Sequence, residues 1–132
     1  MPDVNMLAVL LCGVSSMMLG AIWYSPVLFA GAWQRGAGLG DEALAGGNMA
    51  LIYGLAFALS LAAAYVFAMF LGTEMGLWPS VAAGGAAGLF WVAAAFGINY
   101  LFERKSLRLW LINGGYHAVQ FALFGLILGL FS

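Results

Sequence analysis

The Asp, Glu, Lys and Arg residues of this chain lie outside four long apolar stretches, except Arg108, which is the second residue of the last stretch. The sequence has four basic and five acidic residues, and the others fall near the N-terminus and in the segments between the stretches. A helix needs about 20 residues to cross a hydrocarbon core, and each stretch is long enough. The sequence therefore predicts an all-α integral membrane protein, a four-helix bundle that forms a single transmembrane domain over residues 1–132. The predicted spans are Val4–Tyr24, Asn48–Leu71, Ser80–Phe102 and Leu107–Phe131.

The composition excludes a soluble domain and nucleic-acid binding. The chain is 65% hydrophobic and 7% charged, whereas soluble domains carry about 25% charged residues. With a net charge of −1 and four basic side chains, the chain has little with which to neutralise phosphates. We therefore expect the chain to have the lipid bilayer, and no nucleic acid, as its partner.

The basic residues lie on one side of the predicted bundle. Four spans place both termini on the same side, together with the loop Thr73–Pro79. Arg35, Arg104, Lys105 and Arg108 all fall in or directly beside the two loops on the other side. Because Lys and Arg concentrate in cytoplasmic loops, we expect these loops in the cytoplasm and both termini outside. The last three of these side chains are also expected to contact lipid headgroups.

A short apolar and aromatic segment follows the first span. Pro26 cannot continue the first helix with a normal hydrogen bond. The next residues, Val27–Gln34, include Phe29 and Trp33 and are too few to span a membrane. We expect them to form a short helix in the membrane interface.

Small residues recur at four-residue spacing in each span. Such pairs let helix backbones approach closely. The sequence does not separate pairs that pack inside one bundle from pairs that pack between protomers. Four pairs exceed what a simple bundle needs, which favours a homo-oligomer. The pairs are Ser16 and Gly20, Gly54 and Ala58, Gly84 and Gly88, and Gly125 and Gly129.

Neutral polar side chains collect in the predicted cytoplasmic half of the spans. Asn113, His117 and Gln120 share one face of the fourth span, and Tyr116 flanks that face. An unpaired amide is costly in lipid, so this stripe must point into the bundle or into an oligomer interface. Hydrogen bonding between helices accounts for such stripes in most bundles. A cytoplasm-facing ligand pocket with an apolar floor is the alternative, and its further candidates are Asn48, Tyr53 and Asn99.

The sequence predicts no catalytic, metal or cofactor site. Proton relays and most ion-coupled transporters need ionisable groups within the membrane, and no Asp, Glu, Lys or Arg lies in the middle of a span. His117 alone supplies one axial ligand for haem or chlorophyll, without a second His or a suitably spaced Cys. A hydrolase that used Ser15 or Ser16 with His117 would lack an orienting carboxylate.

The segment Gly20-Ala-Ile-Trp-Tyr-Ser-Pro26, with Phe29 and Trp33 after it, resembles the opening of a bacterial membrane family, domain of unknown function 1761. Asn99 before a basic loop and Asn113-Gly-Gly-Tyr-His117 are similar to that family as well. The resemblance covers nearly the whole chain and implies a small four-span protein of the bacterial cytoplasmic (inner) membrane. It implies no activity. The residues that it marks are Trp23, Tyr24, Ser25, Pro26 and His117.

Missing catalytic groups and abundant small-residue pairs predict a membrane protein that is not an enzyme. We expect it to act as a homo-oligomer or as an accessory subunit of a membrane complex. The alternative is a binder or transporter of a small neutral or apolar ligand that uses the polar pocket around His117. A pigment or haem protein ligated by His117 is the third possibility.

Overall fold

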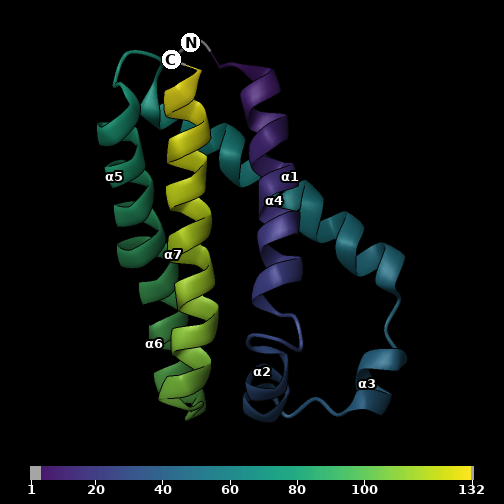
Figure 1. The fold of residues 1–132 in the computed structure, drawn as a ribbon. Coiled ribbons are helices and arrows are strands. Elements are labelled where there is room, and N and C mark those ends of the chain that lie inside the picture. Colours follow the sequence, from purple (N-terminus) through teal and green to yellow (C-terminus); the bar gives the residue numbers. More distant parts are fainter. Residues whose placement is uncertain (1–3, 132) are drawn as a thin grey trace.

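The computed structural model describes residues 4–131, and in this range the chain forms helices without a strand (Figure 1). Four helical segments are long and apolar enough to cross a membrane, and the π-helical segment η1 lies within the third of them. The predicted all-α, four-span class is confirmed, and the chain is a multi-pass membrane protein. The elements are α1 (Met6–Trp23), α2 (Ala30–Ala37), α3 (Asp41–Ala45), α4 (Met49–Leu71), α5 (Leu77–Ala87), η1 (Gly88–Ala93), α6 (Ala94–Glu103) and α7 (Leu107–Leu130).

Polar side chains determine where three of the spanning helices begin. In α1, α4 and α7 the residue before the first turn accepts a backbone N–H at 3.1 Å. Such a cap satisfies one of the N–H groups that a helix start leaves unpaired. The third span begins before the predicted Ser80 because Pro79 lies in its first turn, where no N–H is needed. The capping residues are Asn5, Asn48 and Ser106.

The short helix after α1 begins later than predicted. It covers Ala30–Ala37 instead of Val27–Gln34. Residues 25–29 form a turn, in which the carbonyl oxygen of Ser25 accepts the N–H groups of Leu28 and Ala30 at 3.0 and 3.1 Å. The helix ends at Gly38, whose φ of 72° lies in the left-handed region that glycine adopts without strain.

The helices α5, η1 and α6 run beside α7 in the opposite direction, and α1 lies next to α7 on its other side (Figure 1). The helix α4 crosses α1 obliquely. The start of α1 and the end of α7 lie at one end of the bundle, and α2 and α3 lie at the opposite end. We call the latter the basic end, because it carries Arg35, Arg104, Lys105 and Arg108.

Glycine pairs bring α5 and α7 into close contact. The pair that begins at Gly84 on α5 faces α7, and the pair that begins at Gly125 on α7 faces α5. A Cβ added to Gly84 would overlap the carbonyl oxygen of Phe121, and one added to Gly125 would overlap that of Ser80. Only glycine allows backbones to pack this closely. Two of the four predicted small-residue pairs therefore pack against the neighbouring helix within one protomer.

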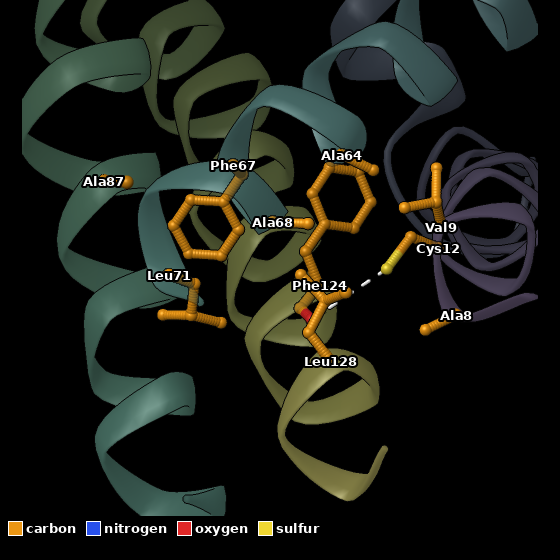
Figure 2. Close-up of a cluster of buried hydrophobic side chains, with 10 residues drawn as sticks. All are labelled: Ala8, Val9, Cys12, Ala64, Phe67, Ala68, Leu71, Ala87, Phe124 and Leu128. Atoms are coloured by element: carbon orange, nitrogen blue, oxygen red, sulfur yellow. Dashed lines mark hydrogen bonds between the residues drawn. The ribbon is translucent and has the colours of Figure 1, made fainter. Parts of the chain in front are cut away.

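The buried apolar core lies toward the end of the bundle where α1 begins and α7 ends (Figure 2). Phe124 of α7 is fully buried beside α1 and α4, and its carbonyl oxygen accepts the Cys12 thiol at 3.9 Å. Phe67 of α4 packs edge-on against Phe121, with ring centres 5.7 Å apart. This cluster holds the C-terminal half of α4 in the bundle. Its other members are Ala8, Val9, Ala64, Ala68, Leu71, Ala87 and Leu128.

The N-terminal half of α4 lies away from the rest of the bundle. Leu51 and Leu55 are each 56% exposed and Leu59 is 71% exposed, whereas Ala64 and Ala68 further along the helix are buried. Figure 1 shows this half of the helix diverging from α1 and leading back to α3. The divergence separates α1 from α4 at the basic end of the protein.

Candidate functional site

Ser16 of α1 joins polar side chains from two other helices. Its hydroxyl lies 3.1 Å from the hydroxyl of Ser60 on α4 and 3.1 Å from that of Tyr116 on α7. It also accepts a hydrogen bond from the Gln120 side-chain amide. The Tyr116 hydroxyl donates to the Ser16 carbonyl oxygen at 2.8 Å. Because Ser16 is 1% exposed and Gln120 5% exposed, these bonds provide the partners that water would otherwise supply.

His117 extends this network toward α6. Its Nδ1 lies 2.7 Å from Oε1 of Gln120. An amide oxygen only accepts hydrogen bonds, so Nδ1 carries the proton in this arrangement. The ring stacks on Phe96 with centres 5.1 Å apart and an angle of 14°. The imidazole is thus held by one hydrogen bond, by this stack and by an edge-on contact with Tyr116, with ring centres 5.0 Å apart. Within residues 4–131, no three His, Cys, Asp or Glu side chains are grouped to hold a metal ion.

A second network connects helices at the basic end. The Tyr24 hydroxyl donates to Oδ1 of Asn113 at 2.6 Å, and Nδ2 of Asn113 donates to the Tyr100 hydroxyl at 2.8 Å. The indole N–H of Trp23 donates to the carbonyl oxygen of Ile112 at 2.9 Å. The aromatic pair at the end of α1 therefore fixes this helix end to α7.

A cavity of about 1040 Å³ lies between α1 and the N-terminal half of α4, with parts of α2 and α3 at its basic end. Ligand pockets usually measure about 300–1,000 Å³. None of the described residues that line the cavity is Asp, Glu, Lys or Arg. The cavity can therefore offer a ligand apolar contacts and hydrogen bonds to neutral groups. The polar or amphipathic lining residues are Ser16, Tyr24, Ser25, Trp33, Tyr53 and Tyr116.

Small apolar residues make up much of the cavity wall. Met17, Gly20 and Ala21 of α1 line it together with Ile52 and Ala56 of α4. Gly20 and the two alanines leave space that a larger side chain would fill. The sequence does not mark these residues as site candidates because they are apolar, and the spacing of Ser16 and Gly20 predicts helix packing instead. The four-residue spacing alone does not show whether a small residue faces a helix or a cavity.

The candidate pocket residues occupy four different settings. Tyr53 and Tyr116 line the cavity. Asn48 caps α4, where it accepts the N–H of Leu51, and Asn99 is exposed on α6. The cavity therefore reaches the polar stripe of α7 only at Tyr116. The candidates that belong to the hydrogen-bond networks and do not line the cavity are Asn113, His117 and Gln120.

The W-Y-S-P segment contributes to both the cavity and the networks. Tyr24, Ser25 and Pro26 line the cavity, and the indole N–H of Trp23 forms a hydrogen bond to α7.

Three basic residues lie exposed at the basic end, where contact with lipid headgroups stays a prediction. They are Arg104, Lys105 and Arg108.

Comparison with known proteins identifies a family and no individual relative. The model of the family described as protein of unknown function (DUF1761) matches residues 7–129. Neither the curated proteins nor the solved structures contain a match to the chain. The matched range includes all four spanning helices except their outermost residues, and every residue that lines the cavity.

Proposed function

The chain belongs to the family of proteins of unknown function (DUF1761), and we propose that it binds a small, uncharged and mainly apolar molecule in the cavity between α1 and α4. The cavity itself supports this proposal. It combines a volume suited to a ligand with a wall that carries no charged side chain in the described residues. Apolar pockets with a few polar groups are the usual form of small-molecule sites.

Side-chain contacts hold the inner end of the cavity and the corner between α1 and α2 at its basic end, so these parts of the wall are formed before a ligand arrives. Near its inner end, Ser16 contacts Ser60 and so connects α1 to α4. At its basic end, Trp33 of α2 packs against Tyr24 with ring centres 5.8 Å apart. A preformed site spends less of the binding free energy on ordering side chains.

We propose binding or transport, not catalysis, as the role of this site. Neutral hydroxyl and indole groups recognise a ligand, whereas general acid–base chemistry needs a group that titrates near the working pH. We also propose that the basic end faces the cytoplasm, since Lys and Arg favour cytoplasmic loops. The cavity would then open toward the cytoplasmic leaflet of a bacterial inner membrane.

Ala56→Trp is the direct test of ligand binding. The indole would fill part of the cavity, and overpacked sites reject other occupants, so we expect the amount of co-purified small molecule to fall about tenfold. Organic extraction of the purified protein followed by mass spectrometry measures this amount. Ala86→Trp is the matched control, because Ala86 is exposed on α5. If wild type and Ala56→Trp release the same molecules in the same amounts, the cavity is not a binding site.

A second candidate function, self-association, is favoured by the outer face of α4. A Cβ added to Gly54 would have no atom within 4 Å, and Ala58 one turn later is exposed. This small-residue pair is therefore free of helix contacts in one protomer, unlike the pairs on α5 and α7. We propose that it packs against the same pair of a second copy, as isologous interfaces do.

Gly54→Leu would test this contact, because a leucine keeps two backbones apart. Counting photobleaching steps of a fluorescent fusion in lipid nanodiscs gives the number of chains per particle. We expect two chains for the wild type and for Gly85→Leu, whose position on α5 also has no atom within 4 Å, and one chain for Gly54→Leu. Single chains in the wild-type sample would contradict self-association.

A further inference from the structure

Three hydrogen-bond donors that line the cavity have no side-chain hydrogen bond to any residue in the described range. They are the hydroxyls of Ser25 and Tyr53 and the indole N–H of Trp33. Among the described residues, the Ser80 hydroxyl is the polar side-chain atom that is fully buried without a hydrogen-bond partner. The three donor atoms are therefore not fully buried. All three residues therefore leave a donor available to a molecule in the cavity.

The polar groups further inside are already paired with one another. The Tyr116 hydroxyl donates to the Ser16 carbonyl oxygen, and the Tyr24 hydroxyl donates to Asn113. The Ser16 hydroxyl has neighbours on α4 and α7. A ligand meets few free donors here and mostly the apolar surface of Met17 and the residues opposite it on α4. The free donors of the described lining thus lie toward the basic end of the cavity, which apolar residues such as Leu39, Leu44 and Met49 also line.

The absence of charged side chains from the described lining argues against an ionised ligand. The described lining has no Lys or Arg for an anion and no Asp or Glu for a cation. Arg35 lines a separate hollow on the outside of the basic end, together with Gln34 and Asp41. An ion placed in the cavity would lose hydration without gaining a counter-ion, which costs several kcal/mol.

We propose that the ligand is an uncharged amphiphile whose head group is a carbonyl that accepts hydrogen bonds, as in a ketone, quinone or ester. Tyr53, Ser25 and Trp33 donate to this head at the basic end, and the apolar body extends between α1 and α4 toward Ser16. Free donors select an acceptor, because a head with no acceptor would leave them unpaired after desolvation. This assignment rests on the proposed binding function and adds the chemistry and the direction of the ligand.

Photolabelling in lipid nanodiscs tests the head group. The first probe is 4-decylbenzophenone, which is uncharged, carries one acceptor carbonyl and couples to nearby C–H bonds on irradiation. The second is an aryl trifluoromethyl diazirine with the same alkyl chain, which has no carbonyl. We expect saturable labelling of cavity peptides by the benzophenone. Tyr53→Phe removes one hydrogen bond to the carbonyl, so the half-saturating concentration of the benzophenone should rise about threefold to tenfold. The half-saturating concentration of the diazirine should not change.

Tyr65→Phe is the matched control, since Tyr65 lies on the same helix, lines a different hollow and also makes no side-chain hydrogen bond in the described range. Labelling of the cavity by both probes with equal affinity, and no effect of Tyr53→Phe, would overturn the carbonyl assignment while supporting cavity binding. Labelling by neither probe above the level on the exposed side of α5 would overturn the proposed binding function itself.

Discussion

Gly125→Leu is expected to separate α5 from α7 and to lower the free energy of unfolding by about 3 kcal/mol or more. The first added atom, Cβ, would overlap the carbonyl oxygen of Ser80 on α5. This oxygen belongs to a helical backbone, so a side-chain rotation cannot relieve the overlap and the helices must move apart. Overpacking usually costs about 1–3 kcal/mol even where side chains adjust. Thermal unfolding in detergent, followed by circular dichroism, measures the loss.

Gly85→Leu is the matched control for this substitution. Gly85 is the neighbour of Gly84 on α5, but a Cβ added to it has no atom within 4 Å. Leucine has a higher helix propensity than glycine by roughly 0.5–1 kcal/mol, so the control should be at least as stable as the wild type. Equal unfolding temperatures for the two variants would show that α5 and α7 do not meet at Gly125.

Ser16→Ala is expected to destabilise the fold by about 2 kcal/mol. The substitution leaves the buried Gln120 amide and the hydroxyl of Ser60 without their partner. Average interhelical hydrogen bonds in membranes contribute about 0.6 kcal/mol, but a buried donor that loses its partner costs about 1–3 kcal/mol. Ser15→Ala is the control, because the Ser15 hydroxyl bonds at 2.7 Å to the Cys12 carbonyl of its own helix.

A double-mutant cycle shows whether the Ser16 effect comes from an unpaired partner. Removing both polar groups in Ser16→Ala with Gln120→Leu should cost less than the sum of the two single losses, because no amide then remains unpaired. The free energies come from reversible unfolding in mixed detergent micelles. Additive losses would mean that Ser16 and Gln120 do not depend on each other.

The spanning helices were predictable because charge is costly in a bilayer and the described chain keeps its charges out of their middle, with Glu103 and Arg108 at helix ends. The divergence of α4 was not predictable. This helix is apolar on every side from Met49 to Leu71, so its sequence does not indicate which face packs inward. Its C-terminal half is held by Phe67 and its neighbours, and that contact depends on the positions of other helices.

The packing partners of the small-residue pairs were not predictable from the sequence either. The four pairs have identical spacing, yet those at Gly84 and Gly125 pack against backbone, whereas Gly54 meets nothing within 4 Å. Four-residue spacing places residues on one helix face but does not identify what covers that face. The distinction requires the relative positions of the helices.

The hydrogen bonding of the polar stripe on α7 was predictable, although Asn113, His117 and Gln120 of this stripe do not line the cavity. The side chains of Asn113, His117 and Gln120 all bond across or along helices, as the cost of unpaired amides requires. Asn48 and Asn99 have the same polarity but lie near helix ends, where capping or exposure satisfies an amide equally well. The cavity itself depends on small residues such as Ala56, which carry no chemical signature.

An experimental structure of the protein purified into nanodiscs from its own membranes tests the central claim most directly. We expect continuous non-protein density in the cavity between α1 and α4, bounded by Tyr53 at the basic end and by Met17 and Tyr116 further inside. Ala56→Trp under the same conditions should lack this density. If α4 instead packs along α1 and closes the cavity, or the cavity holds only acyl-chain density like that on the outer surface, the proposed binding function is wrong.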